Sequence, residues 1–152
     1  MLQIEVIRAL LQTYPQLELA ILVGSRAADF EKPIHEIPNV EYPHITTQTL
    51  IIQSVVTEQS DWDIAIRWQK GLNDLNVLEQ TEVLRHKIAQ AINSHADKVD
   101  LIDIATARLA MRAVIDEEGI PLKGEDSLNW SHFLTQTWAE LEDYYWRKEH
   151  AA

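Results

Sequence analysis

The chain has 152 residues, of which 46% are hydrophobic, so it is long enough for one domain with a substantial core. Its 24 Asp and Glu against 13 Lys and Arg give a net charge of −11, which disfavours direct binding to nucleic acid or to a membrane surface and suits a basic protein partner or metal-assisted chemistry. The lack of cysteine excludes disulfides and thiolate metal sites. With no cationic leader and no apolar run of membrane-spanning length, we expect a cytoplasmic protein.

The first elements in chain order are a helix and a buried strand. Apolar residues recur at helical spacing, and Pro15 ends the helix. The residues that form its apolar face are expected to be Leu2, Val6, Leu10 and Leu11. Residues 17–23 alternate and then become continuously apolar, which predicts a strand that is buried on both faces and closed by Gly24-Ser25.

Residues 28–60 differ in composition from what precedes them. Three prolines at five-residue intervals predict an extended or loop-like first half. The second half, TTQTLIIQSVVTEQ, has the composition of a strand or a hairpin arm.

A second strand and a long helix follow. Residues 62–68 predict a strand with Ile64 and Ile66 on one face and Asp63 on the other. Asn73 is expected to cap a helix that runs to about Ser94. The residues of this helix that are expected to face inward are Leu75, Leu78, Leu84, Ile88 and Ile92.

The last third of the chain predicts a strand and two helices. Residues 98–104 form the strand, Thr106 caps the next helix, and Gly119 with Pro121 ends it. Residues 127–150 predict a C-terminal helix with an aromatic stripe that includes Trp130, Phe133, Leu134, Trp138, Leu141 and Tyr145. This order predicts a single α/β (α+β) domain over residues 1–152, in which helices flank a small mixed β-sheet.

Polar groups stand where the first strand ends. A Gly-Ser turn that enters a helix exposes backbone N–H groups and a hydroxyl, which suits a phosphate, and Arg26 adds positive charge. Taken alone, the pair Gly24-Ser25 is more often an ordinary tight turn.

Aspartates stand at the other two strands. Asp61 and Asp63 are two residues apart and therefore share one face, where two like charges are unfavourable unless a cation lies between them. Oxygen ligands favour Mg²⁺ or Mn²⁺, although a solvated turn is an equally strong interpretation. Asp100 lies inside an apolar strand, where a carboxylate without a partner is costly. Asp103 points to the opposite face, so at most one of these two joins the pair.

A phosphate turn, two paired aspartates and a third strand aspartate, in that order, are typical of nucleotidyl transfer. Metals held by the carboxylates neutralise the charge that develops during in-line displacement. The third carboxylate is placed to act as a general base on an attacking hydroxyl.

At ILVGSRA, SDWDIAI and VDLIDI, followed by EEGIPL, the sequence resembles the minimal nucleotidyltransferases of the DNA polymerase β superfamily. The closest resemblance is to the MNT-type antitoxins encoded beside HEPN RNase toxins, and it covers about residues 1–125. It implies a minimal nucleotidyltransferase fold that transfers AMP from ATP to a tyrosine of the toxin and so silences the RNase. The implied triphosphate ligands are Gly24 and Ser25, with Arg26 beside them, and the implied catalytic and Mg²⁺-binding residues are Asp61, Asp63 and Asp100.

The long segment at residues 28–60 departs from the family pattern and is expected to be an insertion. Because loop closure costs grow slowly with length, the insertion can loop out and let its flanks meet. The alternatives are that it blocks the ATP pocket, recruits a partner or changes which substrate enters. Three functions stay open: an AMP transferase, an antitoxin that acts by binding alone, and a small-molecule nucleotidyltransferase. We favour the first. Trp130 and Trp138 are expected to contact the toxin or a second copy of the chain.

Overall fold

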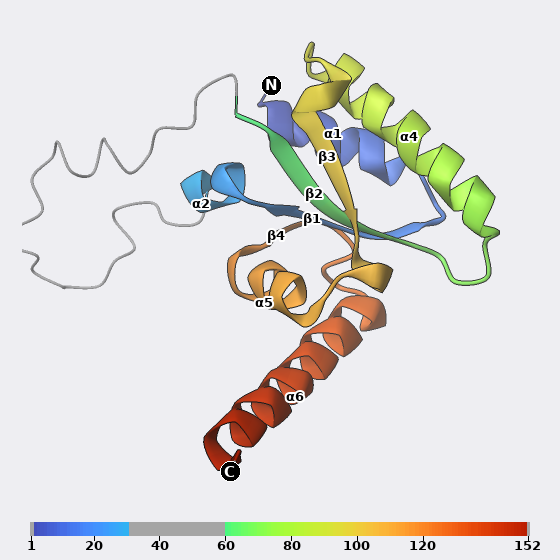
Figure 1. Cartoon of the computed structure of the whole chain (residues 1–152). Helices are drawn as coiled ribbons and strands as arrows, with labels where there is room; N and C mark the ends of the chain where they lie inside the picture. Colours follow the sequence, from blue (N-terminus) through green and yellow to red (C-terminus); the bar gives the residue numbers. More distant parts are fainter. Residues whose placement is uncertain (1, 31–59, 152) are drawn as a thin grey trace, which may run out of the picture.

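The computed structural model describes residues 2–30 and 60–151. The described strands form one mixed sheet with the order β3-β2-β1-β4, and helices cover both of its faces (Figure 1). β1 (Leu17–Val23) pairs antiparallel with β2 (Trp62–Trp68) and with β4 (Ile120–Lys123), whereas β2 runs parallel to β3 (Val99–Asp103). The predicted small mixed sheet flanked by helices is therefore confirmed.

One face of the sheet is covered by α1 (Gln3–Gln12) and α4 (Asp74–Ala91). The largest side chains of this core layer include Ile7, Leu11, Leu22, Ile64, Leu84 and Ile88, all fully buried. The predicted cap of α4 is confirmed, because the side chain of Asn73 accepts a hydrogen bond from the backbone N–H of Leu75 at 2.9 Å.

The other face is covered by α5 (Leu109–Glu118) and the first half of α6 (Leu128–His150). Its core layer contains Leu19, Ile21, Val23, Ala65, Ile104, Ile115 and Phe133. β1 and β2 lie in the middle of the sheet, so side chains of successive residues in both strands point alternately into the core layers on its two faces. This explains why residues 17–23 read as a strand buried on both faces.

Two predicted helix faces were partly wrong. In α1 the buried residues are Ile4, Ile7 and Leu11, whereas Leu2 precedes the helix and is exposed. In α4 the side chains that pack inward are Val77, Leu84 and Ile88, and Thr81 accepts a hydrogen bond from the Trp68 indole at 3.0 Å. This face, set by three- and four-residue steps, leaves Leu75 and Leu78 exposed.

Two local features also differ from the prediction. Thr106 does not cap the helix that follows: it ends a short 3₁₀ turn, η3 (Ile104–Thr106), and α5 begins only after Arg108. β4 was not predicted, because Pro121 reads as a terminator. A proline is compatible with an edge strand, and β4 is one. The strand or hairpin arm predicted within residues 46–59 lies outside the described residues.

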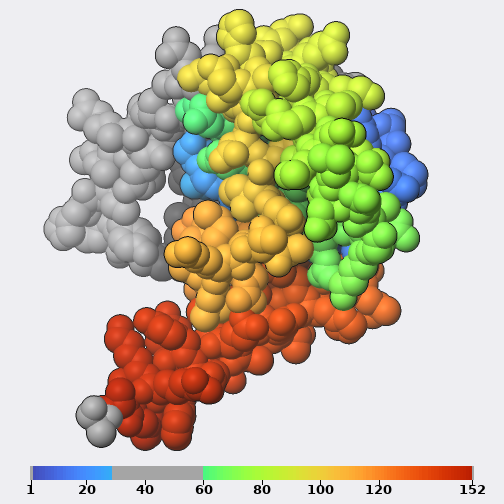
Figure 2. Space-filling model, turned by 45° about the vertical axis from the view of Figure 1, so that its right-hand side comes forward, coloured from blue at the N-terminus to red at the C-terminus, as the bar shows by residue number. Residues whose placement is uncertain are grey.

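The C-terminal helix α6 leaves the body of the domain. Ser127 caps it by accepting a hydrogen bond from the backbone N–H of Trp130 at 3.3 Å. Its second half projects beyond the sheet and α5 (Figures 1 and 2), and Trp138, Tyr145 and Trp146 are exposed there. Trp130, by contrast, is half-buried, stacks on Phe133 and packs against the core, and its contact with the toxin or a second copy stays a prediction. In the described part of the chain no helix is long and apolar enough to cross a membrane.

Candidate active site

The predicted motifs meet at one end of three neighbouring strands. Val23, the last residue of β1, pairs with Asp63 of β2, and Asp63 pairs in turn with Asp100 of β3. The Gly24 turn therefore follows directly beside Asp63. The segments that precede and follow residues 31–59 therefore lie side by side at this end of the sheet.

The backbone of Gly24 lies closer to the Asp63 carboxylate than a residue with a side chain would allow. Its φ of 77° lies in the left-handed region, and a Cβ atom placed on it would stand 2.6 Å from Oδ2 of Asp63. The Gly24 carbonyl accepts hydrogen bonds from the backbone N–H groups of Ala27 and Ala28, which begins the short helix α2 (Ser25–Phe30). The turn thus brings backbone against a carboxylate and leaves Ser25 exposed at its tip.

Arg26 joins the two flanks. Its guanidinium is buried, donates through Nε and Nη2 to the carbonyl of Ser60 at 3.1 and 2.8 Å, and lies 4.2 Å above the Trp62 ring. Burial lowers the pKa of Arg26, and the charge of Asp61 acts against that shift. Sequence reasoning assigned Arg26 only a charge toward the nucleotide, and that contact stays a prediction. The structure adds that Arg26 fixes the residue before Asp61.

The charges of the other two aspartates act on Asp63. Asp63 is half-buried, and its pKa is raised first by burial, then by the charge of Asp100 and then by that of Asp61. Asp100 is exposed rather than buried, because β3 is the edge strand of the sheet. The free-energy cost of burying a carboxylate, which the sequence predicted for Asp100, therefore falls on Asp63.

The carboxylates fit a divalent cation, although they do not form a finished ligand set. In the residues that the structure describes, no three acidic or imidazole side chains are gathered as in a preformed metal site. Asp61 instead points toward Lys98, with 3.8 Å between Oδ1 and Nζ. This exposed ion pair contributes only about 0–1 kcal/mol, so a cation can displace it at little cost. Mg²⁺ and Mn²⁺ prefer oxygen ligands, and a bound cation would offset the repulsion that the neighbouring carboxylates exert on Asp63.

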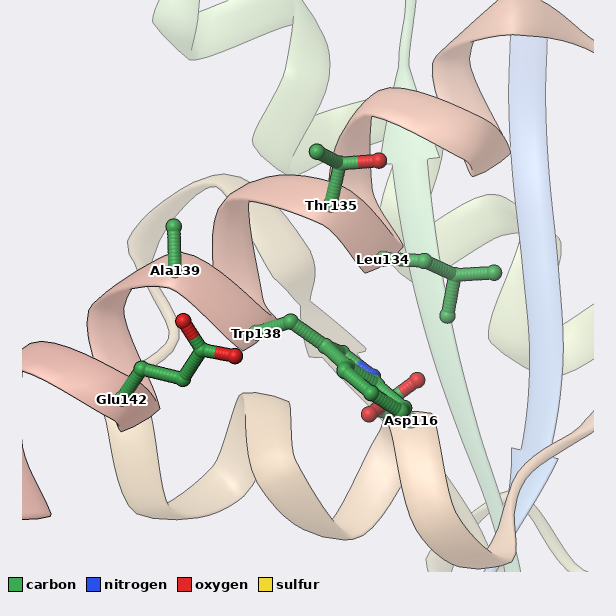
Figure 3. A pocket seen from close by; sticks show the side chains of 6 residues that line it. All are labelled: Asp116, Leu134, Thr135, Trp138, Ala139 and Glu142. Atoms are coloured by element: carbon green, nitrogen blue, oxygen red, sulfur yellow. The ribbon is translucent and has the colours of Figure 1, made fainter.

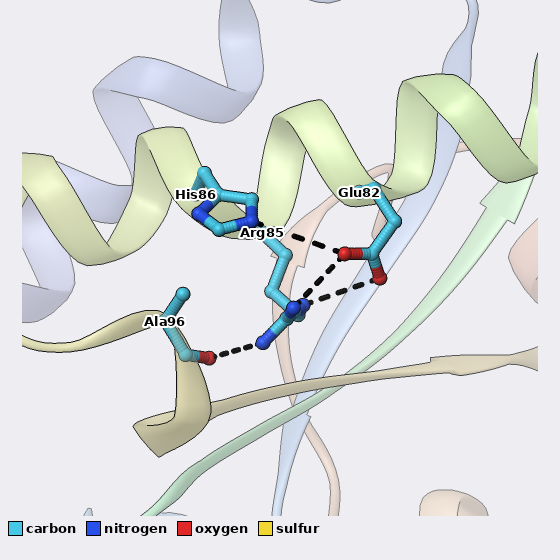
Figure 4. Close-up of polar contacts among 4 residues, drawn as sticks. All are labelled: Glu82, Arg85, His86 and Ala96. Atoms are coloured by element: carbon cyan, nitrogen blue, oxygen red, sulfur yellow. Dashed lines mark hydrogen bonds and ion pairs between the residues drawn. The ribbon is translucent and has the colours of Figure 1, made fainter.

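A polar cleft opens beside Asp61 and Asp100. It has a volume of about 410 Å³ and is lined also by Asp97, Glu82 and Arg85. Arg85 pairs with Glu82 at 2.9 Å and donates to the Ala96 carbonyl, while His86 lies 3.9 Å from the same carboxylate (Figure 4). Arg85 thereby ties α4 to the segment that enters β3. Sequence reasoning missed this residue, although a Glu and an Arg three positions apart on a predicted helix signal an ion pair.

Asp103 does not join the site. It pairs with Ile66, further along β2 from Asp63, and its Oδ1 accepts a hydrogen bond from the backbone N–H of Ala105 at 2.9 Å. This carboxylate caps η3 and supports the turn toward α5.

No protein-family model and no curated protein matches the chain. Solved structures do. A chain of a toxin-antitoxin crystal structure with AMP-PNP superposes with a TM-score of 0.58 at 21% identity, covering 98% of this chain and 94% of that chain. A chain of the toxin-antitoxin MntA-HepT gives 0.53 at 20% identity, covering 97% and 91%. A chain of a complex between a tri-AMPylated Shewanella oneidensis HEPN toxin and an MNT antitoxin gives 0.56 at 19% identity, covering 97% and 94%. The chain therefore has the minimal nucleotidyltransferase fold of these structures, as its resemblance predicted.

Proposed function

We propose that this chain is an MNT-type antitoxin that transfers AMP from ATP to a tyrosine of a HEPN RNase toxin in a Mg²⁺-dependent reaction. The observation that carries the proposal is the junction of Gly24, Asp63 and Asp100 on three adjacent strand ends. This junction supplies a phosphate turn and carboxylates in one place. The fold is shared with structures that contain an ATP analogue and an AMPylated HEPN toxin.

A further neighbour supports the role of the aspartate pair. One solved MntA-HepT mutant carries Asp-to-Glu substitutions at two positions separated by one residue, and its chain superposes with a TM-score of 0.56 at 20% identity. Asp61 and Asp63 have the same spacing.

Each residue of the site has a defined part in the proposed transfer. Asp61, Asp63 and Asp100 would hold the divalent cation, which would supply positive charge to neutralise the triphosphate. Ser25 is exposed beside Gly24 and donates its hydroxyl to a phosphate oxygen. The tyrosine oxygen attacks the α-phosphorus, the bond to the pyrophosphate breaks, and the exposed Asp100 carboxylate accepts the phenolic proton.

The toxin is proposed to dock between α5 and α6. A groove of about 470 Å³ there is lined by the apolar side chains of Leu134 and Trp138 and by the carboxylates of Asp116 and Glu142 (Figure 3). Trp138 is 60% exposed. A lining of apolar side chains and carboxylates matches a partner surface that combines apolar residues with Lys or Arg. The same groove favours the second candidate function, an antitoxin that acts by binding alone, because a docking surface needs no chemistry.

Intact-mass spectrometry tests the proposal. The HEPN protein encoded beside this chain is incubated with the chain, ATP and Mg²⁺, and we expect a mass gain in AMP units. Asp61→Asn and Asp63→Asn should abolish the gain while the complex still forms; Asp126→Asn, an exposed acid elsewhere, should change nothing. A stable complex without any mass gain would leave binding alone as the function. AMP transfer to a small molecule without the toxin would support the third candidate function.

A further inference from the structure

Another cavity, distinct from the polar cleft and from the α5–α6 groove, lies at the opposite end of the sheet from the candidate active site. It has a volume of about 390 Å³, within the range of small-molecule sites, and forms where the end of β2, η3, α5 and α6 meet. Asp63 stands at the beginning of β2, whereas Arg67, near the end of that strand, lines this cavity. The two sites are therefore separated by the length of the strand (Figure 1).

The charge of this cavity is opposite to that of the chain. The described residues that line it include three cations, Arg67, Lys70 and Arg112, and only one carboxylate, Glu140. The whole chain carries a net charge of −11. A local excess of positive charge on so acidic a protein favours an anionic ligand.

The cations are incompletely neutralised. Arg67 lies 3.8 Å from the nearest Glu18 oxygen, which is longer than a hydrogen bond, and that oxygen is buried without any hydrogen-bond partner. Lys70 is exposed and has no ion-pair partner within residues 2–30 and 60–151. Arg112 alone is closely paired, with 2.5 Å between its Nη2 and Oε2 of Glu140.

A buried hydroxyl in the wall of the cavity lacks a partner. Thr137 is 0% exposed, and its Oγ1 makes no hydrogen bond. A threonine within a helix commonly bonds the carbonyl four residues earlier, and buried polar groups without partners are rare and call for an explanation. Glu140, one turn later on α6, also lines the cavity; its carboxylate pairs with Arg112 and accepts a hydrogen bond from the Gln136 side chain at 3.4 Å.

We propose that this cavity binds a small phosphate-bearing anion, which takes the place of Glu140 on Arg112 and accepts hydrogen bonds from Lys70 and the Thr137 hydroxyl. Ile104 and Phe133 supply an apolar wall, which suits a ligand with an organic body such as a nucleoside monophosphate. The inference concerns a site separate from the transfer reaction and does not depend on the proposed function.

Titration of the full chain tests this site. AMP, pyrophosphate and inorganic phosphate are added separately without divalent cation, so that the aspartate site stays unloaded, and binding is followed by calorimetry and by backbone amide shifts. We expect binding with shifts at Gln136 and Thr137. Tighter binding of AMP than of the two inorganic anions would show that the organic body is recognised, and equal binding would assign the site to free phosphate groups.

Two sets of variants, one expected to weaken anion binding and one expected to strengthen it, distinguish an effect on the site from a loss of folding. Arg112→Gln should weaken binding by about tenfold or more, since it removes a charge-assisted hydrogen bond, and Lys70→Gln by a smaller factor. Glu140→Gln should strengthen binding, because it removes the competing carboxylate. Arg147→Gln, which breaks an exposed ion pair with Asp143 on the same helix, is the control and should have no effect. Weaker binding by Glu140→Gln, shifts confined to the Gly24 turn, or no binding of any of the three anions would overturn the proposal.

Discussion

The substitution Gly24→Ala should push the Gly24 turn away from the Asp63 carboxylate and destabilise the protein. Gly24→Ala places a side chain at a φ of 77°, which costs roughly 1–2 kcal/mol for an L-residue. The same methyl group would lie 2.6 Å from Oδ2 of Asp63, so the carboxylate must move, at a further cost of about 1 kcal/mol. We therefore expect the free energy of unfolding to fall by roughly 2–3 kcal/mol.

Gly71 provides a matched control for the free-energy cost of placing a side chain at a positive φ. Its φ is 89°, yet a Cβ atom there would meet nothing within 4 Å, so Gly71→Ala carries the backbone cost alone. Urea denaturation should show Gly24→Ala to be the more destabilising by about 1 kcal/mol. In an Asp63→Ala background this difference should vanish, because the remaining Asp63 Cβ atom lies at an ordinary 3.6 Å. Equal costs of the two substitutions in the unaltered chain would refute the close contact.

The remaining predictions concern charge, the junction and the aromatic residues. The pKa of Asp63 in the folded protein is raised above its ordinary 3.8, so the folded protein loses stability as the pH rises and Asp63 ionises. The Asp63→Asn variant should therefore be more stable than the unaltered chain at neutral pH and lose this advantage below about pH 3.8. In a thermal-shift assay Mg²⁺ should stabilise the unaltered chain but not this variant. Arg26→Gln should destabilise the protein by on the order of 2 kcal/mol and slow AMP transfer, since it removes the buried charged donors to the Ser60 carbonyl; unchanged melting would contradict the role of Arg26 as a link between the flanks. Trp130→Ala should cost on the order of 2 kcal/mol in urea denaturation, whereas Trp138→Ala should leave stability unchanged and weaken toxin binding in calorimetry; the reverse pattern would contradict the proposed docking groove.

Much of the site followed from local sequence pattern. The alternation of residues 62–68 predicted which face carries Asp63, and the apolar run that ends at Gly24 predicted where β1 stops. The strand pattern of residues 98–104 also gave Asp100 and Asp103 as candidates for the third carboxylate, and the resemblance selected Asp100. These features depend on neighbours within a few residues, which is the range over which side-chain periodicity is reliable.

Other features depended on sheet order and long-range contacts. The exposure of Asp100 follows from the edge position of β3, which no local pattern specifies. The contact between Gly24 and Asp63 requires the antiparallel register that joins Val23 to Asp63 across the long intervening segment. Burial of Arg26 against Ser60 and Trp62 likewise appears only once those flanks are brought together.

Isotope position in ATP tests the central claim most directly. The toxin and this chain are incubated with Mg²⁺ and ATP labelled either on the α-phosphate or on the γ-phosphate, and label on the toxin is counted together with released pyrophosphate. Nucleotidyl transfer predicts α-label on a toxin tyrosine, one pyrophosphate released for each AMP transferred, no γ-label, and loss of all transfer with Asp63→Asn. Transfer of the γ-label, or a stable complex that carries neither label, would contradict the account.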